Sequence, residues 1–199
     1  MARLKGKARD KARKKQKNRD NNSYFLRKKK ILSKIRKWDD PILKETCSPV
    51  DPTEDISEIV KELKSVLMLS DNGLGIAASQ IGYTKRIFVT RPTVTSSKIT
   101  VFVNASIISE SKEKSRRGEG CLSYPGVVAI IDRPADIVVA YEDENFKVHE
   151  GRYKGLDACV ICHERDHNLG ICLVGKAWKE QETKEQETKE QKTKEKNKL

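Results

Sequence analysis

Apolar residues recur at helical spacing shortly after residue 50. Over residues 56–67 they fall three and four positions apart, the pattern of a helix that buries one face against a core. These residues are Ile56, Ile59, Val60, Leu63, Val66 and Leu67. Just upstream, Asp51 is suited to cap the helix, Pro52 to be its first residue and Glu54 to close a capping box. We therefore predict a buried helix that begins near residue 52 and stops at residues 70–73.

β-branched and aromatic residues dominate four later stretches, which are separated by Pro, Asn and Gly. We predict strands at residues 86–90, 99–103, 127–131 and 136–140. A second helix is predicted at about residues 156–168, with Gly170 beyond its end as a C-cap. A helix, several short strands and a final helix are typical of an α+β domain.

The two ends of the chain differ in composition from the segment between them. Residues 1–38 hold 17 Lys and Arg against two Asp, more positive charge than the net +12 of the whole chain. Residues 179–199 repeat Lys-Glu-Gln-Glu-Thr and lack an apolar residue before Leu199. Neither end can bury enough apolar surface to fold alone. We expect a basic, disordered or transiently helical arm at residues 1–30, one folded domain at residues 31–178 and a low-complexity tail at residues 179–199.

The cysteine count and the lengths of the apolar runs indicate the cellular environment of the protein and whether it crosses a membrane. Five cysteines, an odd number, and a basic start without an apolar segment behind it argue against a secreted disulfide framework. The longest apolar runs, such as residues 127–131, are far shorter than the ~20 residues that cross a bilayer. We expect a soluble, intracellular monomer that does not bind membranes.

The most specific chemical signal is the segment HERDH at residues 163–167, within the second predicted helix. On a helix, His163 and His167 lie four residues apart on one face and can bind one metal ion. The chain has only one other histidine, so two of three fall at this spacing. Glu164 lies between these two ligands, where a carboxylate can transfer protons.

Two earlier segments add a softer ligand and a tight turn. Cys121 lies in the segment EGCLS (residues 119–123), and the segment GLGIAASQ (residues 73–80) ends in the carboxamide of Gln80. Two imidazoles and one thiolate leave an open position on a catalytic metal. They suit Zn²⁺, Fe²⁺, Co²⁺ or Ni²⁺ rather than Mg²⁺ or Ca²⁺, and the residues alone do not choose among the four.

In this order, the three segments resemble the signature motifs of the peptide deformylases, hydrolases that remove the formyl group from the N-terminal formyl-methionine of new polypeptides. The resemblance covers residues 31–178 and begins at the segment WDDPIL (residues 38–43), which is similar to the family's opening strand and turn. It implies antiparallel strands wrapped around a central metal-binding helix. It also implies Fe²⁺ as the native metal, with Zn²⁺ or Ni²⁺ as substitutes, and formyl-methionyl nascent peptides as substrates.

The resemblance implies roles for single residues beyond the three metal ligands. Glu164 would first take a proton and then deliver one to the departing amine, and the Leu122 N–H and the Gln80 side chain would stabilise the oxyanion. Glu119 and Asp166 would hold ligands or loops in place. The residues expected to contact the substrate are Gly73, Gly75, Ile76, Gly120, Leu156, Cys159 and Val160. The apolar members would form a slot for the methionine side chain, and the glycines let the backbone run close to the substrate.

Four positions and the C-terminus depart from the family. Cys162 precedes the first motif histidine, where Gln is usual, and Asn168 follows the second, where Leu is usual. Val128 stands where many members carry an Arg that helps to hold the substrate backbone, and Arg117 stands where an apolar residue is common. The folded part is expected to end near Trp178, as in the compact deformylases of some viruses and organelles.

Other functions compete for the same residues. Another HExxH metallopeptidase would use the same helix but usually takes a later His or Glu, not Cys121, as third ligand. A non-catalytic RNA-associated protein with a structural metal would need the basic arm but not Glu164. Three interpretations of the arm remain open. It is a solvated extension, including one from a misassigned start, or a segment that binds ribosomal RNA, or an organellar transit peptide. The expected location is the cytoplasm of a bacterium or of a virus-infected cell, or else an organelle.

The remaining Cys and His residues have ordinary structural interpretations. Cys159 and Cys162 form a C-x-x-C pattern without a second pair, which favours buried positions at the entry of the motif helix over a redox or zinc site. Cys47 and Cys172 are expected to be small buried apolar residues. His149 is expected to be a surface or hydrogen-bonded histidine rather than a ligand.

Overall fold

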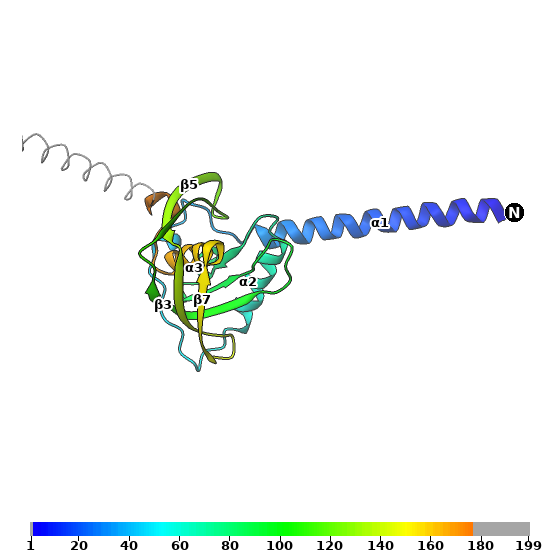
Figure 1. Cartoon of the computed structure of the whole chain (residues 1–199). Helices are drawn as coiled ribbons and strands as arrows, with labels where there is room; N and C mark the ends of the chain where they lie inside the picture. The colour runs from blue at the N-terminus through cyan, green and yellow to red at the C-terminus, as the bar shows by residue number, and fades with distance from the viewer. Residues whose placement is uncertain (1, 177–199) are drawn as a thin grey trace, which may run out of the picture. The chain divides into compact units, whose positions relative to one another are not determined.

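The computed structural model describes residues 2–176 and contains two compact units, which divide between Lys34 and Ile35 (Figure 1). The predicted tail at residues 179–199 and the expected end of the domain near Trp178 lie outside the described residues. None of the helices in the described residues is long and apolar enough to span a membrane.

The first unit consists of one long helix, α1 (Ala2–Leu32) (Figure 1). The structure gives this segment as a helix, and the expectation that the arm is disordered or transiently helical stays a prediction. Lys, Arg, Gln and Ala, which dominate this segment, have high helix propensity, and proline is absent from it. Polar and charged residues are distributed around the helix, so apolar residues form no continuous stripe along it.

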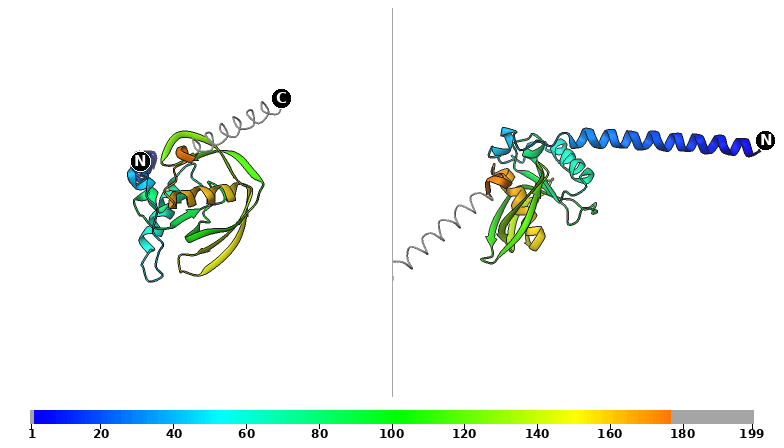
Figure 2. Two further views of the ribbon diagram at one scale, coloured as in Figure 1. Left: turned by 90° about the vertical axis from the view of Figure 1, so that its left-hand side faces the viewer. Right: turned by 90° about the horizontal axis from the view of Figure 1, so that it is seen from above.

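The second unit combines a five-stranded antiparallel sheet, in the order β1-β2-β3-β6-β7, with a separate pair of strands. The sheet contains β1 (Gly75–Ala77), β2 (Ile87–Thr90), β3 (Thr100–Glu110), β6 (Asp136–Glu142) and β7 (Val148–Lys154). The pair is the β4–β5 hairpin, β4 (Lys114–Cys121) and β5 (Tyr124–Pro134). Helix α3 (Gly155–Asn168) contacts strands of both, and Figures 1 and 2 show it enclosed by them. The predicted α+β class is confirmed.

Helix α2 (Ser57–Leu69) has the predicted amphipathic pattern and ends where expected, but its predicted start is wrong. Glu54 accepts a hydrogen bond from the Asp51 N–H (2.9 Å), as in the expected capping box, yet this bond closes a separate turn. The helix begins later, where the Asp55 side chain accepts from the Ser57 N–H (2.9 Å). Short acidic side chains make the same local bonds in turns and at helix starts, which explains the error.

The four predicted strands are confirmed as parts of β2, β3, β5 and β6, although β3 and β5 extend well beyond them. β4 and β7 were not predicted as strands because Lys, Arg, Glu and Gly dominate them, and their partner strands supply the pairing. The expected strand at residues 38–43 is absent. A turn and the 3₁₀ helix η1 (Pro41–Lys44) take its place, capped by Asp40, which accepts from the Ile42 N–H (3.1 Å).

The core lies where α2 and α3 cover the central strands. Phe88 of β2 and Phe102 of β3 are cross-strand partners with ring centroids 4.8 Å apart. They pack against Ala158, Ile161 and Cys162 of α3. Helix α2 also contacts β1 and β2, and consecutive residues of both strands are buried. The core-facing side of α3 is therefore fixed by aromatic packing, and its other side is available for chemistry.

Replacing Phe102 with Ala should lower the free energy of unfolding by about 3–5 kcal/mol, because it leaves a cavity beside Phe88 and α3. Urea denaturation followed by circular dichroism measures this change. Ile108→Ala is the matched control, since Ile108 is 53% exposed on the same strand and should shift stability by no more than about 0.5 kcal/mol. A loss at Phe102 as small as that of the control would contradict the assigned core.

Candidate active site

Helix α3 carries the HERDH segment into the interior of the second unit. Apart from the half-buried Arg165, all residues from Ile161 to Asn168 are buried, so the motif histidines and Glu164 are shielded on most sides. The helix is capped at Leu169, and Gly170 follows with a φ of 69°, in the left-handed region that glycine adopts without strain. The predicted position and C-cap of this helix are confirmed.

Cys121, His163 and His167 come together as the only cluster with metal-binding geometry among the described residues. Their ligand atoms all lie within 4.8 Å of one another. The Sγ atom of Cys121 is 3.3 Å from Nε2 of His167. Cys121 comes from the end of β4 and both histidines from α3, so the set forms only when the hairpin packs on the helix. A thiolate and two imidazoles fit one divalent transition-metal ion, and the open coordination position would face the cavity that Cys121 and His163 line.

Glu119 orients the first histidine. Its Oε2 atom lies 2.9 Å from Nδ1 of His163, and Arg133 donates to both carboxylate oxygens at 2.7 and 2.9 Å. Burial alone would raise the pKa of Glu119, but the hydrogen bonds from Arg133 and His163 lower this pKa to about 2. An ionised carboxylate only accepts, so Nδ1 of His163 carries the proton and Nε2 is the nitrogen available to a metal.

Arg133 links Glu119 to Asp166. Its Nη1 atom lies 2.5 Å from Oδ2 of Asp166, which also accepts from Lys176 (2.9 Å). The guanidinium is 2% exposed, and although burial lowers the pKa of Arg133, the two carboxylates raise it above its ordinary value. Arg133 was missed by sequence reasoning. The signal that points to it is indirect, because two buried carboxylates at one site require a cation.

Glu164 lies in the cavity wall without an ion-pair partner among the described residues, and its Oε2 atom is buried without a hydrogen bond there. Burial raises its pKa to about 7, although the nearby His163 acts in the opposite direction. The backbone of β1 passes close by: a Cβ atom built on Gly75 would lie 2.5 Å from Oε1 of Glu164. Glycine at this position leaves room for the carboxylate.

Gln80 reaches the same site from the 3₁₀ helix η2 (Ala78–Ile81), which follows β1. Its Oε1 atom accepts from the Ala77 N–H (2.9 Å), which directs Nε2 toward Sγ of Cys121 (3.4 Å) and Oγ of Ser123 (3.1 Å). Leu122 begins the two-residue turn of the β4–β5 hairpin and also lines the cavity. Ser123 was not predicted, and it anchors the amide that sequence analysis assigned to the site.

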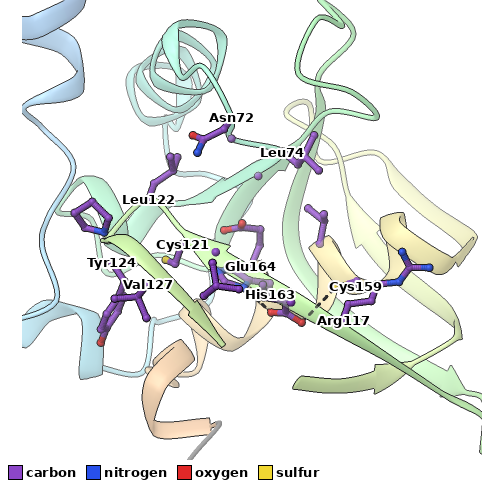
Figure 3. A pocket seen from close by; sticks show the side chains of 18 of the residues that line it. Asn72, Leu74, Arg117, Cys121, Leu122, Tyr124, Val127, Cys159, His163 and Glu164 are labelled. Atoms are coloured by element: carbon purple, nitrogen blue, oxygen red, sulfur yellow. Dashed lines mark hydrogen bonds and ion pairs between the residues drawn. The ribbon is translucent and has the colours of Figure 1, made fainter. Parts of the chain in front are cut away.

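A cavity of about 520 Å³ opens beside these groups, between β1, the β4–β5 hairpin and the first half of α3 (Figure 3). Six of the seven residues expected to contact the substrate line it: Gly73, Gly75, Gly120, Leu156, Cys159 and Val160. Ile76 is the exception, since its side chain is fully buried and is not among the lining residues. Strand alternation explains this, because the neighbour of a residue that faces the cavity points to the opposite side.

Comparisons with known proteins agree with this arrangement. The sequence pattern of the polypeptide deformylase family matches residues 32–183. The chain belongs to the peptide deformylase family. A peptide deformylase of Pseudothermotoga lettingae is 34% identical over 145 residues, covering 72% of this chain and 82% of the relative. Deformylases remove the formyl group from formyl-methionine at the start of nascent polypeptides, and they are metallohydrolases.

Solved deformylase structures share the fold as well. The structure from Thermotoga maritima superposes with a TM-score of 0.66 at 29% identity, covering 71% of this chain and 95% of that one. A structure from Acinetobacter baumannii, solved with Met-Ala-Ser bound, gives a TM-score of 0.65 at 30% identity, covering 71% of this chain and 96% of that one. The comparisons give no support to a different metallopeptidase or to a non-catalytic RNA-associated protein.

The positions that depart from other deformylases fall in two settings. Cys162 packs in the core cluster and Asn168 is buried, so both lie beneath the site. Val128, which is 70% exposed, and Arg117 both line the cavity. The substitutions at Val128 and Arg117 therefore change the surface that faces a substrate.

The other cysteines and the third histidine are structural. Cys159 donates to Oε1 of Glu119 (3.2 Å), and burial, with Glu119 nearby, raises the pKa of this thiol to about 12. Cys159 and Cys162 are both free and buried. Cys47 is buried, whereas Cys172 is only half-buried, so the expectation for Cys172 is wrong. His149 stacks on a tyrosine and bonds to an aspartate (2.8 Å), which confirms that it is a satisfied histidine.

Replacing Arg133 with Met should lower the free energy of unfolding by about 3–5 kcal/mol, since two buried carboxylates lose their shared partner. Arg116→Met is the control, because Arg116 lies on the same hairpin, 62% exposed and 3.7 Å from Asp132, where a surface pair contributes about 0–1 kcal/mol. Urea denaturation of both variants provides the comparison. Equal stability of the two would show that the deformylase does not depend on the buried cluster.

Proposed function

We propose that this deformylase acts through one divalent metal ion held by Cys121, His163 and His167, with Glu164 transferring protons and Gln80 and Leu122 stabilising the oxyanion. The observation that carries the proposal is the convergence of these groups, from three separate segments, on a single cavity. When bound, such an ion supplies Lewis acidity, which lowers the pKa of water and polarises the formyl carbonyl. The remaining work falls to the residues of the chain.

The donor set suits several divalent transition metals, and the family resemblance favours Fe²⁺ among them, with Zn²⁺ or Ni²⁺ as substitutes. Glu119 keeps the proton of His163 on Nδ1, so that Nε2 offers its lone pair. His167 is fully buried, and this burial lowers its pKa well below the ordinary value. A neutral imidazole is the form that binds a metal. A lowered pKa keeps the ring neutral, with one nitrogen free of a proton, and therefore supports the assignment of His167 as a ligand.

Glu164 is proposed to take a proton from the attacking water and to deliver one to the departing amine. Its buried carboxyl group has a pKa of about 7, and a general acid–base group works best when its pKa lies near the operating pH. Its position beside His163, facing the cavity, puts it within reach of a formyl group held over the ligand cluster (Figure 3). A carboxylate paired with a cation would have a lower pKa and would not take up a proton readily near neutral pH.

The oxyanion is proposed to receive hydrogen bonds from the side-chain amide of Gln80 and the backbone N–H of Leu122. The bond from the Ala77 N–H to Oε1 fixes the Gln80 amide with its N–H groups toward Cys121. Donors held in place before the reaction stabilise developing charge without reorganisation. The wall formed by Leu156, Cys159 and Val160 offers an apolar slot for the methionine side chain. The Met-Ala-Ser bound to the Acinetobacter baumannii enzyme supports a peptide of this kind as the ligand.

We also propose that α1 binds ribosomal RNA. It holds 14 Lys and Arg against two Asp, and the absence of an apolar stripe argues against insertion into a membrane surface. Positive charge distributed around a helix suits a partner that presents phosphates on several sides, and the release of counterions makes such binding independent of sequence. The activity would then lie where formylated chains leave the ribosome, in the cytoplasm of a bacterium or of a virus-infected cell, or in an organelle.

The first test is release of formate from formyl-Met-Ala-Ser by protein purified anaerobically with Fe²⁺ or with Ni²⁺. We expect turnover in the unmodified protein and none in Cys121→Ala, which loses a ligand. Glu164→Ala should keep metal and fold, measured by elemental analysis and circular dichroism, but lose at least about 100-fold in kcat. Arg165→Ala, on the same helix and away from the cavity, should stay active. Substantial turnover in Glu164→Ala with metal bound would refute the role of Glu164.

Deletion of residues 1–30 tests the RNA proposal separately. The full chain should sediment with ribosomes at about 50 mM salt and dissociate at about 200 mM, because log affinity falls linearly with log salt. The deleted protein should stay in the supernatant at both concentrations yet cleave formyl-Met-Ala-Ser at an unchanged rate. Equal sedimentation of the two proteins at low salt would rule out α1 as the ribosome contact.

A further inference from the structure

Arg117 brings an exposed positive charge to the cavity that the proposed mechanism does not use. It lies on β4, lines the cavity, and in Figure 3 is seen beyond Cys159, on the side away from Cys121. Its Nε atom donates to Oγ of Ser115 (2.9 Å). Among the side chains that the structure describes, Arg117 has no acidic partner. The two Nη groups are therefore available to a ligand.

The other charged groups of the cavity do not compensate this guanidinium. Glu119 is buried and its carboxylate is shared by Arg133 and His163, and Glu164 is buried at the ligand cluster. On α3, Nη2 of Arg117 lies 4.0 Å from where a Cβ on Gly155 would be, and Asp157 in the first turn makes no ion pair with it in the described structure. The remaining rim is apolar or neutral.

The spacing along β4 relates Arg117 to a particular residue of the substrate. Arg117 is four residues before Cys121, which corresponds to roughly 13 Å along a strand. In an extended peptide, the side chains of the first and third residues point to the same side, roughly 7 Å apart. With the formyl group at the ligand cluster, the first side chain in the apolar slot and the peptide extended beside β4 toward Arg117, the third side chain would lie on the side of this arginine, whose long side chain spans the remaining distance.

We propose that Arg117 is a specificity-determining residue that favours an acidic side chain at the third position of the formylated peptide. This inference rests on the proposed function. A guanidinium whose Nε is already held by Ser115 is oriented, and its Nη groups can bind a carboxylate with two parallel hydrogen bonds. Because the group is exposed, the preference should be modest and should weaken with salt.

The test compares three peptides with amidated C-termini, so that the third side chain is the only variable charge: formyl-Met-Ala-Glu, formyl-Met-Ala-Lys and formyl-Met-Ala-Gln. At low salt we expect kcat/KM for the Glu peptide to exceed that for the Lys peptide by about fivefold or more. Arg117→Gln should abolish the preference, measured as the ratio of kcat/KM for the Glu and Lys peptides, and Arg117→Glu should reverse it. Arg116→Gln, on the opposite face of β4, should keep it.

The outcomes separate this inference from the function on which it rests. If the Gln peptide releases no formate, the proposed function fails. If that peptide is cleaved but Glu and Lys are cleaved equally well, only the role of Arg117 is overturned. A preference that persists in Arg117→Gln would assign the effect to other charges and would overturn the inference. Equal losses on all three peptides would show a structural role and would also overturn the inference.

Discussion

The buried guanidinium of Arg133 is the contact on which the site depends. It comes from β5, holds Glu119 of β4 with two hydrogen bonds, and reaches Asp166 on α3. The β4–β5 hairpin shares no strand pairing with the five-stranded sheet in the described structure, so its position relative to α3 depends on contacts of this kind. Since the hairpin carries Cys121 and the helix carries both histidines, the ion cluster and the metal ligands are assembled by the same packing.

Two helices divide the tasks of support and chemistry. α2 covers one face of the central strands with aliphatic side chains, and α3 covers the other with Ala158, Ile161 and Cys162, two of which are small. Small residues on the core side of α3 let the helix lie close to the sheet, which places its remaining circumference inside the protein instead of at the surface. Histidines and carboxylates on that side are then held away from bulk water. Electrostatic interactions are stronger in the protein interior than in water.

Sequence reasoning found the groups that share a short segment and missed those defined only by packing. His163 and His167 were predictable because helical spacing alone places them on one face. Cys121 and Gln80 were placed in the site through the family resemblance, and the structure brings both to the ligand cluster. Arg133 was not predictable, since a single arginine in an apolar strand looks the same whether it faces solvent or a buried carboxylate. Ile76 does not line the cavity because residues 75 and 76 point to opposite sides of β1, and the sequence did not show that this segment is a strand.

The close approach of Gly75 to Glu164 also limits how the sequence can vary. A side chain at residue 75 and a glutamate at residue 164 would occupy the same space. The two positions are 89 residues apart, yet residue 75 cannot gain a side chain while the glutamate is kept. A larger residue in the first motif would become tolerable only after the glutamate had been shortened or lost, and with it the group that handles protons. The glutamate therefore restricts residue 75 to glycine, although this glycine takes no part in the reaction.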